Sequence, residues 1–243
     1  MIGKVLLVSV CGFFVGGVGL YLASRAVDAS VRHERRTKFF SYFCIVNAVL
    51  VGACLGKATV DGLVLLILSA GAYELYRALR RAKAVRTALR AGIGAGYAFL
   101  SLGMLAFVTT STREMTAFVY LVVAAFDGFS QVGGQLFGKH RLAPTISPRK
   151  SVEGALGGTV AAAITAVLLR TLVPVGLAQS AKACFWIVLA ALSGDLLASW
   201  VKRICGIKDF GSILPGQGGV LDRFDSFLFA GPAWLLILHP WNS

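Results

Sequence analysis

Charged side chains are scarce in this chain. Of its 243 residues only 14% are Asp, Glu, Lys or Arg, whereas 57% are hydrophobic. A chain with so little polar surface cannot cover a soluble globule of this size. The sequence also lacks stretches rich in Pro or Ser, low-complexity repeats and any polar segment long enough for a soluble domain. The composition therefore predicts a single integral membrane domain over residues 1–243.

Cysteine is present in an odd number and without close pairing. None of the five forms a Cys-x-x-Cys pair; they are Cys11, Cys44, Cys54, Cys184 and Cys205. This spacing favours neither a disulfide framework nor a metal site. We expect these cysteines to behave as small apolar side chains.

Long apolar runs take the place of the missing polar surface. A helix needs about 20 residues to span a hydrocarbon core of about 30 Å. Eight runs reach or approach that length, at residues 4–24, 39–56, 62–79, 91–111, 115–138, 154–177, 181–200 and 226–241. The sequence therefore predicts an all-α polytopic membrane protein with about eight transmembrane helices.

Acidic residues are fewer than basic ones, and 11 Asp and Glu against 24 Lys and Arg give a net charge of +13. Nucleic acid binding is one explanation of such an excess, but the positions of the cations favour another. Nineteen of the 24 fall in alternate connections, at 25–38, 77–90, 139–150 and 202–223. This asymmetry follows the positive-inside rule. We expect no nucleic-acid partner, cytoplasmic basic connections, and both termini outside a bacterial-type inner or plasma membrane.

Residues that could carry chemistry are concentrated in the second half of the chain. Residues 1–111 form apolar helices and basic connections of unclear role, whereas acids near predicted spans and long polar loops gather in 115–243. We therefore expect a cytoplasmic catalytic site in the second half. Glycines four residues apart, at Gly12 and Gly16 and at Gly154 and Gly158, indicate close helix packing. The sequence leaves open whether that packing is within one chain or in a homodimer.

Asp127 lies in the middle of the fifth predicted span. A charged side chain at that depth costs at least about 2.5 kcal/mol unless it faces a polar cavity or a partner. We interpret it as a functional residue that faces substrate. The alternative is a packing residue that bonds Ser130 or Gln131.

A polar loop at 139–158 leads into the sixth predicted span. Its two prolines keep it extended, and hydroxyl and basic side chains at Ser147, Arg149, Lys150 and Ser151 stand beside a helix start. Exposed N–H groups and the helix dipole make such a start an anion site. A capping role for Ser151, with Glu153 in the first turn, is the alternative.

The segment 199–225 combines acids, cations and glycines in a chain that otherwise avoids charge. Asp195 stands just upstream, and Asp222 and Asp225 share one helical face. Carboxylates that converge from two helices fit Mg²⁺, which prefers a few carboxylates together with substrate phosphates. The alternative is structural ion pairing, of Asp195 with Lys202 and of Asp222 with Arg223. Phosphate-neutralising cations and turn glycines complete the segment, at Lys202, Arg203, Lys208, Gly216, Gly218 and Gly219.

These residues together resemble the signature of the phosphatidate cytidylyltransferases, or CDP-diacylglycerol synthases. The family pattern is similar in order and spacing to Ser199, Lys202-Arg203, Lys208-Asp209, Pro215-Gly216-Gln217-Gly218-Gly219 and Asp222-Arg223-Phe224-Asp225. The resemblance extends upstream through Asp127 and residues 137–140 to residues 147–154. It covers roughly the second half of the chain.

The resemblance implies Mg²⁺-dependent transfer of a cytidylyl group from CTP to phosphatidic acid, which gives CDP-diacylglycerol and pyrophosphate in phospholipid biosynthesis. CTP, phosphatidic acid and membrane lipids are the expected partners. A site for two metal ions, the second of unknown identity, would be formed by Asp195, Asp222 and Asp225. Catalytic roles would fall on Asp195, Asp222, Lys208 and Asp209. Substrate contacts would come from Asp127, Ser147, Lys150, Lys202, Arg203, Gly218, Gly219 and Arg223.

One position departs from the family pattern, because Gln217 stands where the family usually has His. Gln forms hydrogen bonds but carries no proton charge at neutral pH. The alternatives are therefore a paralogue for another lipid phosphate and a noncatalytic sensor of CTP or lipid. A transporter that uses Asp127 and Asp195 as an ion path is a further alternative, although broken repeat helices are not evident.

Overall fold

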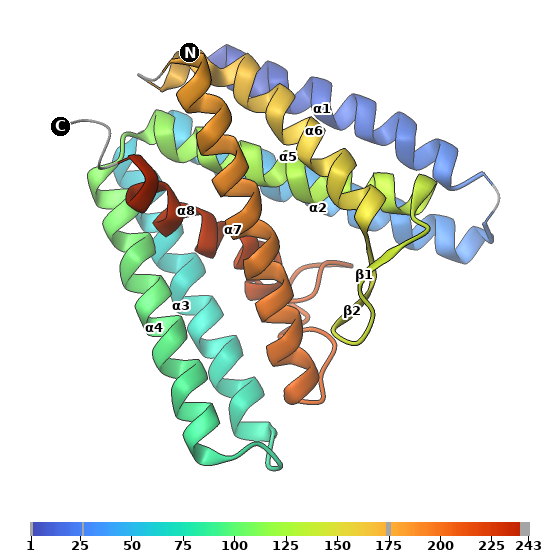
Figure 1. The fold of residues 1–243 in the computed structure, drawn as a ribbon, viewed down its shortest axis with the longest axis vertical. Coiled ribbons are helices and arrows are strands. Elements are labelled where there is room, and N and C mark those ends of the chain that lie inside the picture. The colour runs from blue at the N-terminus through green and yellow to red at the C-terminus, as the bar shows by residue number, and fades with distance from the viewer. Residues whose placement is uncertain (1, 26, 174–175, 239–243) are drawn as a thin grey trace.

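The computed structural model describes residues 2–25, 27–173 and 176–238 and is almost entirely helical (Figure 1). Its helices are α1 (Ile2–Ala23), α2 (Ala29–Leu55), α3 (Lys57–Arg81), α4 (Thr87–Thr110), α5 (Arg113–Phe137), α6 (Val152–Leu169), α7 (Leu177–Ile204) and α8 (Leu221–Leu238). A short 3-10 turn, η1 (Arg170–Leu172), follows α6. An antiparallel hairpin of β1 (Arg141–Ala143) and β2 (Ser147–Ser151) connects α5 to α6. The predicted all-α class is confirmed.

Seven helices in the described part of the chain, α1 to α7, are long and apolar enough to cross a membrane. The eighth predicted span corresponds to α8, which is not one of these seven because Asp222, Arg223 and Asp225 lie near its start. The prediction of a multi-pass integral membrane protein is confirmed. Residues 174–175 of the sixth predicted span and 239–241 of the eighth lie outside the described residues.

Several helices extend beyond the apolar runs that predicted them. The helix α2 begins at Ala29, well before the predicted start at residue 39, and α7 continues to Ile204. Lys and Arg are good helix formers, so basic flanks prolong a helix without adding apolar length. The cations of these flanks, including Lys38 and Lys202, therefore project from helices instead of loops.

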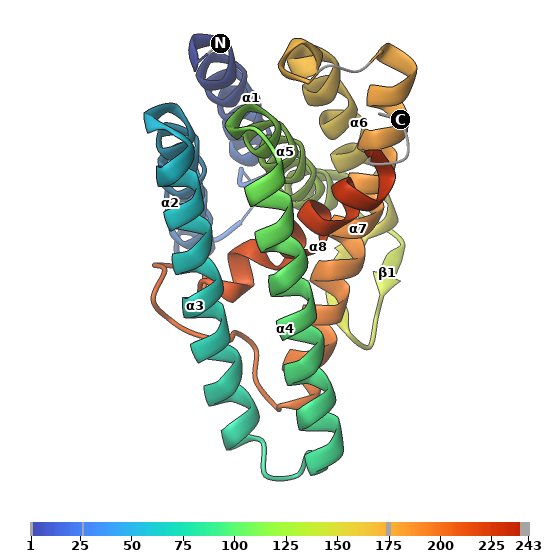
Figure 2. The same ribbon diagram turned by 90° about the vertical axis from the view of Figure 1, so that its left-hand side faces the viewer.

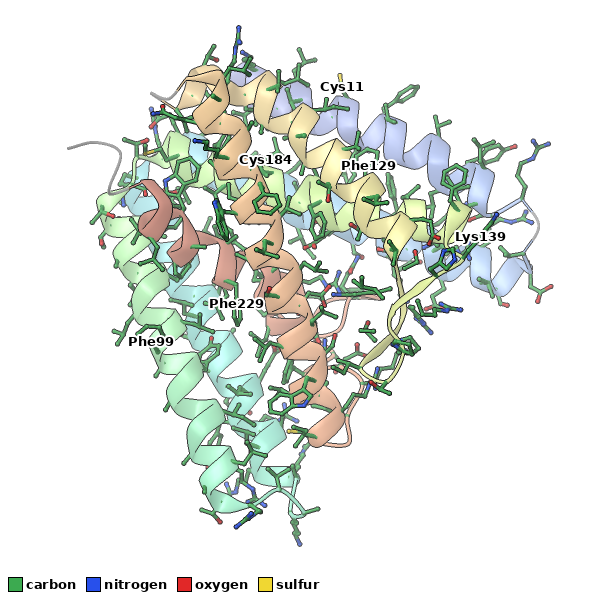
Figure 3. All side chains as sticks on the ribbon, in the orientation of Figure 1. Cys11, Phe99, Phe129, Lys139, Cys184 and Phe229 are labelled. Carbon is green, nitrogen blue, oxygen red and sulfur yellow. The ribbon has the colours of Figure 1, made fainter. Side chains whose placement is uncertain are left out.

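Large apolar side chains cover much of the outer surface. On α4, Phe99 is 77% exposed, and Figure 3 shows it at the outer face of that helix. On α1, Phe14 is 74% exposed. Extended apolar surface of this kind marks a partner or a membrane. Its position on the long apolar helices agrees with lipid contact.

The most buried of the seven spans is α5, in which 56% of the residues of its apolar 18-residue stretch are buried. It contacts α1, α2, α6, α7 and α8, and Figure 2 shows it passing between α2 and α6. The helices α3 and α4 form an antiparallel pair that extends away from this centre (Figures 1 and 2). A helix enclosed in this way can carry a polar side chain such as Asp127 without exposing it to lipid.

Glycines allow α6 to pack closely against α5. A Cβ at Gly158 would overlap Ser130 Oγ and lie 2.5 Å from Phe126 O, and a Cβ at Gly154 would lie 2.5 Å from Ser130 O. The second predicted glycine pair is therefore used within the chain. A Cβ at Gly12 would meet nothing within 4 Å in the described residues. A homodimer stays a prediction.

Candidate active site

A polar cavity of about 600 Å³ lies among α5, α7, the start of α8, the hairpin and the N-terminal part of α2. Most of the site residues predicted from sequence line it. These are Asp127, Lys150, Asp195, Lys202, Lys208, Asp209, Gly218, Asp222, Arg223 and Asp225. Ser147, Arg203 and Gly219 do not line it. Residues almost a hundred positions apart in the sequence therefore share one cavity.

Two ion pairs between lysine and aspartate cross the cavity. Lys202 Nζ lies 2.8 Å from Asp222 Oδ1, and Lys150 pairs with Asp195. The structural alternative from sequence, with Asp195 on Lys202 and Asp222 on Arg223, therefore assigned the wrong partners. Lys150 Nζ forms its ion pair without a well-directed hydrogen bond in the described residues, so its N–H donors remain available to an anion.

Asp222 organises the loop that precedes α8. Its Oδ2 accepts hydrogen bonds from the backbone amides of Phe210 at 2.7 Å and Gly219 at 2.9 Å, while Oδ1 faces Lys202. The residue is 5% exposed. A carboxylate in the first turn of a helix is favoured by the unpaired amides and the dipole there. Both oxygens of Asp222 thus already have partners.

Asp225 on α8 and Asp127 on α5 also line the cavity. Asp225 Oδ1 accepts from the backbone amide of Ser226 at 2.8 Å, but its Oδ2 is buried and has no hydrogen-bond partner in the described residues. Asp127 Oδ1 accepts from the Ser226 hydroxyl at 3.3 Å, so its hydrogen-bond partner is on α8 and is neither Ser130 nor Gln131. The carboxylates of Asp127 and Asp225 each interact electrostatically with Asp195. Three acids from three helices therefore act on one another.

This carboxylate arrangement fits Mg²⁺. Within residues 2–25, 27–173 and 176–238, no three His, Cys, Asp or Glu side chains are close enough to hold an ion by themselves. Mg²⁺ does not need such a cage, because it binds through one or two carboxylates, water and substrate phosphates. The buried, unpartnered Oδ2 of Asp225 is a hard oxygen of the kind this ion prefers. Asp195 and Asp225 are the more available ligands, since both Asp222 oxygens are already hydrogen-bonded.

Glu74 on α3, which is 2% exposed, is a further residue at this site and is not among those predicted from sequence. Its carboxylate accepts from the backbone amides of Val220 at 3.0 Å and Leu221 at 2.8 Å and so caps α8 from another helix. The available signal was a lone acid between apolar residues. Helical spacing puts Arg77 and Arg80 within reach of Glu74. Neither pairs with it, because Arg77 stacks over the Tyr73 ring at 5.6 Å and Arg80 donates to the Tyr76 hydroxyl at 3.3 Å.

The loop before α8 is also attached to α2. Gln217 is 7% exposed, and its side-chain amide donates to the backbone carbonyl of Lys38. Gly216 and Gly218 have positive φ angles of 69° and 87°, and a Cβ at Gly218 would lie 2.9 Å from Asp222 Oδ2. Glycine is required for this backbone path. The residue that departs from the family pattern therefore holds the loop in place.

The hairpin forms the remaining wall of the cavity. Ser151 accepts from the Gly154 amide at 3.1 Å, so the capping alternative for this residue is confirmed. Glu153 accepts from the backbone amides of Lys139 at 3.0 Å and His140 at 3.2 Å and closes the hairpin base. Arg203 donates to the Ile146 carbonyl at 3.1 Å and fixes the hairpin tip to α7. These contacts supply structure, whereas Lys150 extends into the cavity.

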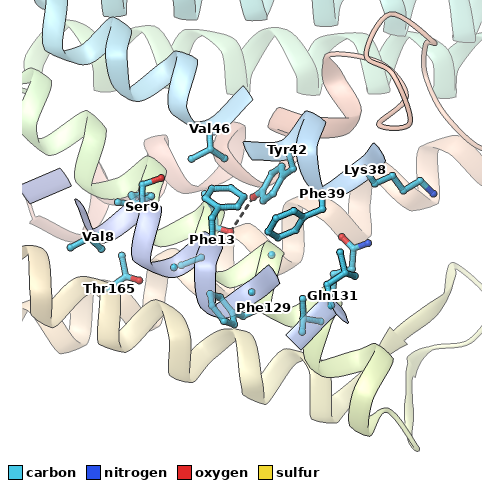
Figure 4. Close-up of a pocket in the computed structure, with 18 of the residues that line it drawn as sticks. Val8, Ser9, Phe13, Lys38, Phe39, Tyr42, Val46, Phe129, Gln131 and Thr165 are labelled. Carbon is cyan, nitrogen blue, oxygen red and sulfur yellow. Dashed lines mark hydrogen bonds between the residues drawn. The ribbon is translucent and has the colours of Figure 1, made fainter. Parts of the chain in front are cut away.

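A second, smaller cavity adjoins the polar one (Figure 4). It measures about 80 Å³ and is lined mainly by apolar side chains of α1, α2 and α5, including Phe13, Phe39 and Val46. Both cavities share the same boundary residues, namely Lys38, Tyr42, Gly128, Gln131 and Gln217. Tyr42 donates to the Ala124 carbonyl at 3.0 Å across this boundary. A polar and an apolar compartment therefore meet at the N-terminal part of α2.

Comparisons with known proteins agree with this site. A model of the cytidylyltransferase family matches residues 93–241, more than half of the chain. A protein of Staphylococcus saprophyticus named phosphatidate cytidylyltransferase is 38% identical over 145 residues, which are 58% of this chain and 56% of that protein. Proteins of the same name from Staphylococcus epidermidis and Staphylococcus aureus are 37% and 35% identical over the same length. The matched region is thus little more than half the length of these curated relatives. The family match shows that the chain belongs to the cytidylyltransferase family.

Proposed function

We propose that this protein transfers the cytidylyl group of CTP to phosphatidic acid, releasing pyrophosphate and leaving CDP-diacylglycerol in the membrane. The observation that carries the proposal is the boundary shared by a charged cavity and an apolar one. A lipid phosphate is amphiphilic, so its two parts need these two environments side by side. The relatives named phosphatidate cytidylyltransferase support the same reaction.

Cations in the cavity suit a triphosphate and a lipid phosphate bound together. Arg149, Lys150, Lys202, Lys208 and Arg223 all line it. Arg presents a planar fork to phosphate oxygens, and Lys brings a compact charge. Lys150 and Lys202 are held in place by their aspartate partners. Their remaining N–H donors bind phosphate oxygens without first having to be ordered.

The reaction needs positioning and charge stabilisation more than proton transfer. An oxygen of the phosphatidate phosphate attacks the α-phosphorus of CTP, a new phosphorus–oxygen bond forms, and the bond to the β-phosphate oxygen breaks. The leaving pyrophosphate takes the electron pair. The lysines and arginines of the cavity stabilise the charge that spreads over the phosphate oxygens. No side-chain nucleophile is required.

Asp195 and Asp225 would hold Mg²⁺ in this proposal, and Asp222, whose two oxygens already have partners, would position the loop beside them. When bound, the ion supplies Lewis-acid stabilisation of the phosphate oxygens. Asp225 offers the unpartnered oxygen Oδ2. Asp195 lies on α7, and its carboxylate is paired with one lysine, Lys150. A second metal ion at the same site is part of this proposal.

We also propose that the cavity opens to the cytoplasm of a bacterial inner membrane and that both ends of the chain lie outside. The connections rich in Lys and Arg, namely α1 to α2, α3 to α4, the hairpin and α7 to α8, lie toward the lower and right-hand side of Figure 1. The other connections lie toward its upper left. Cations gathered at one side support this orientation, and CTP is available on that side.

The test is pyrophosphate release by the detergent-purified protein supplied with CTP, Mg²⁺ and phosphatidic acid. We expect release only when both substrates are present. Asp195→Asn should abolish it without a change in the unfolding midpoint, whereas Asp61→Asn, in a half-exposed pair with Lys57 outside the cavity, should remain active. Full activity of Asp195→Asn would refute the assigned site.

The same assay separates the alternatives. Tight CTP binding without pyrophosphate release would identify a sensor. Release that begins only in Gln217→His would indicate that this chain has lost the reaction while its fold remains. Solute flux in liposomes without nucleotide turnover would identify a transporter.

A further inference from the structure

A third cavity, of about 360 Å³, lies where the end of α1 meets the start of α2. Its walls combine the basic side chains of Arg25, Arg32 and Arg36 with the apolar ones of Leu20, Tyr21 and Phe39. The volume lies within the range of small-molecule sites, which begins at about 300 Å³. The cavity lies outside the region matched by the family model, which begins at residue 93.

The charge in this cavity is unbalanced. Neither Arg25, Arg32 nor Arg36 forms a salt bridge with an acid in the described residues, and no Asp or Glu lines the cavity. Arg32 donates to the Val27 carbonyl at 3.2 Å, but its Nε is buried without a partner in the same part of the chain. A buried donor of this kind requires an acceptor that the protein itself does not supply.

The cavity shares no lining residue with the polar catalytic cavity, although both use α2, and it meets the small apolar cavity at Leu20 and Phe39. Residues advance by about 100° each around a helix, so Arg32, Arg36 and Phe39 share one face of α2. Glu34 and Lys38 lie on the opposite face and line the catalytic cavity. The N-terminal segment of α2 is therefore a wall between two charged cavities.

We propose that the cavity at the junction of α1 and α2 binds the headgroup of an anionic phospholipid from the surrounding bilayer. The three arginines would contact the phosphate, and Leu20, Tyr21 and Phe39 would contact the first part of the lipid tails. A phospholipid is favoured over a free phosphate because Leu20, Tyr21 and Phe39 add an apolar part to the wall and belong to helices long enough to cross a membrane. Anionic surfaces attract juxtamembrane cations in the same way.

The test measures lipid binding, so it does not depend on the proposed reaction. Full-length protein in detergent is titrated with phosphatidylglycerol or phosphatidylcholine, and bound lipid is counted by native mass spectrometry. Arg25→Gln with Arg36→Gln removes two cations whose side chains make no hydrogen bond in the described residues. Each cation near a membrane surface contributes a factor of about five, so this double variant should bind phosphatidylglycerol about 30-fold more weakly.

The matched control is Arg80→Gln with Arg81→Gln, which removes the same charge from the exposed end of α3. We expect this control to change phosphatidylglycerol binding less than about threefold. Phosphatidylcholine should bind weakly to the wild type and to both double variants. Equal losses in both double variants would mean that only overall charge matters and would overturn the proposal. The proposal would also be overturned if inorganic phosphate competed for the cavity as effectively as phosphatidylglycerol does. The same holds if Arg25→Gln with Arg36→Gln lost no phosphatidylglycerol binding.

Discussion

Replacing Glu74 by Gln tests whether one carboxylate on α3 holds the start of α8. The carboxylate accepts two backbone N–H groups, at 3.0 and 2.8 Å, and its side chain is buried. Gln keeps one acceptor but turns an NH₂ group toward the second amide, so one charge-assisted bond is lost and two donors face each other. Such a bond is worth about 1.5–3 kcal/mol, and a negative charge at a partly buried helix start up to about 2 kcal/mol. We expect a loss of about 3 kcal/mol in the free energy of unfolding.

The same substitution should slow catalysis. Val220 and Leu221 directly precede Asp222, so a shift of their backbone moves the carboxylate that orders the loop and pairs with Lys202. A misplacement of about 1 Å can cost two orders of magnitude in rate. We expect kcat for pyrophosphate release to fall at least about tenfold in the folded fraction, with KM for CTP little changed.

Two measurements decide this prediction, denaturant unfolding in detergent and steady-state kinetics. Asp61→Asn is the matched control because it removes an acid from the same helix in a half-exposed pair with Lys57, which is worth less than about 1 kcal/mol. Glu74→Asp keeps the charge and should recover part of both losses. If Glu74→Gln unfolds at the same midpoint as Asp61→Asn and retains its kcat, the capping argument is wrong.

Three further substitutions test other contacts. Gly158→Ala should destabilise the protein by about 1–3 kcal/mol in thermal unfolding, because its Cβ would overlap Ser130; Gly157→Ala, whose Cβ would meet nothing nearer than 3.9 Å, should be nearly neutral. Lys202→Met should cost about 3–5 kcal/mol in denaturant unfolding, because it leaves the buried carboxylate of Asp222 unpaired, and the exposed Lys208→Met should cost little. Gln217→Ala removes the hydrogen bond to Lys38, worth about 1 kcal/mol, so trypsin should cleave the loop at Lys208 about fivefold faster.

The helices could be predicted from sequence because a membrane span depends on length and apolar composition. Each of the eight predicted runs coincides with a helix over most of its described length, although α6 ends at Leu169, well before the predicted end of the sixth run at residue 177. Their ends were less accurate, as at the start of α2 and the end of α7, because basic residues continue a helix beyond the apolar run. The hairpin of Arg141–Ala143 and Ser147–Ser151 was not predicted, since its strands are short and largely polar and carry no alternating pattern. The division of the chain between residues 111 and 115 stays a prediction.

Which residues line the site was easier to predict from sequence than which lysine pairs with which aspartate. A charged side chain within a membrane has a high free energy unless it faces a polar cavity or a partner. The positions of Asp127, Asp195 and Asp222 therefore already indicated a polar cavity. Which lysine meets which aspartate depends on how α7 and the hairpin are placed, and no local spacing contains that information. Glu74 was missed for the same reason, because its partners are backbone amides about 146 residues away.

The N-terminal helices complete a site whose sequence signature lies elsewhere. The family model begins at residue 93, yet Glu74 caps α8, and Lys38 and Tyr42 form the boundary between the polar and apolar cavities. In the proposed reaction the signature residues would surround the phosphates and the metal, and that chemistry is common to every lipid phosphate acceptor. Contacts that distinguish one lipid from another must be made by the walls that the remainder of the lipid reaches, and α2 supplies one of them. Two proteins with the same signature can therefore differ in lipid preference through α2 alone. Exchange of residues 29–55 with a relative should change that preference while CTP use is retained.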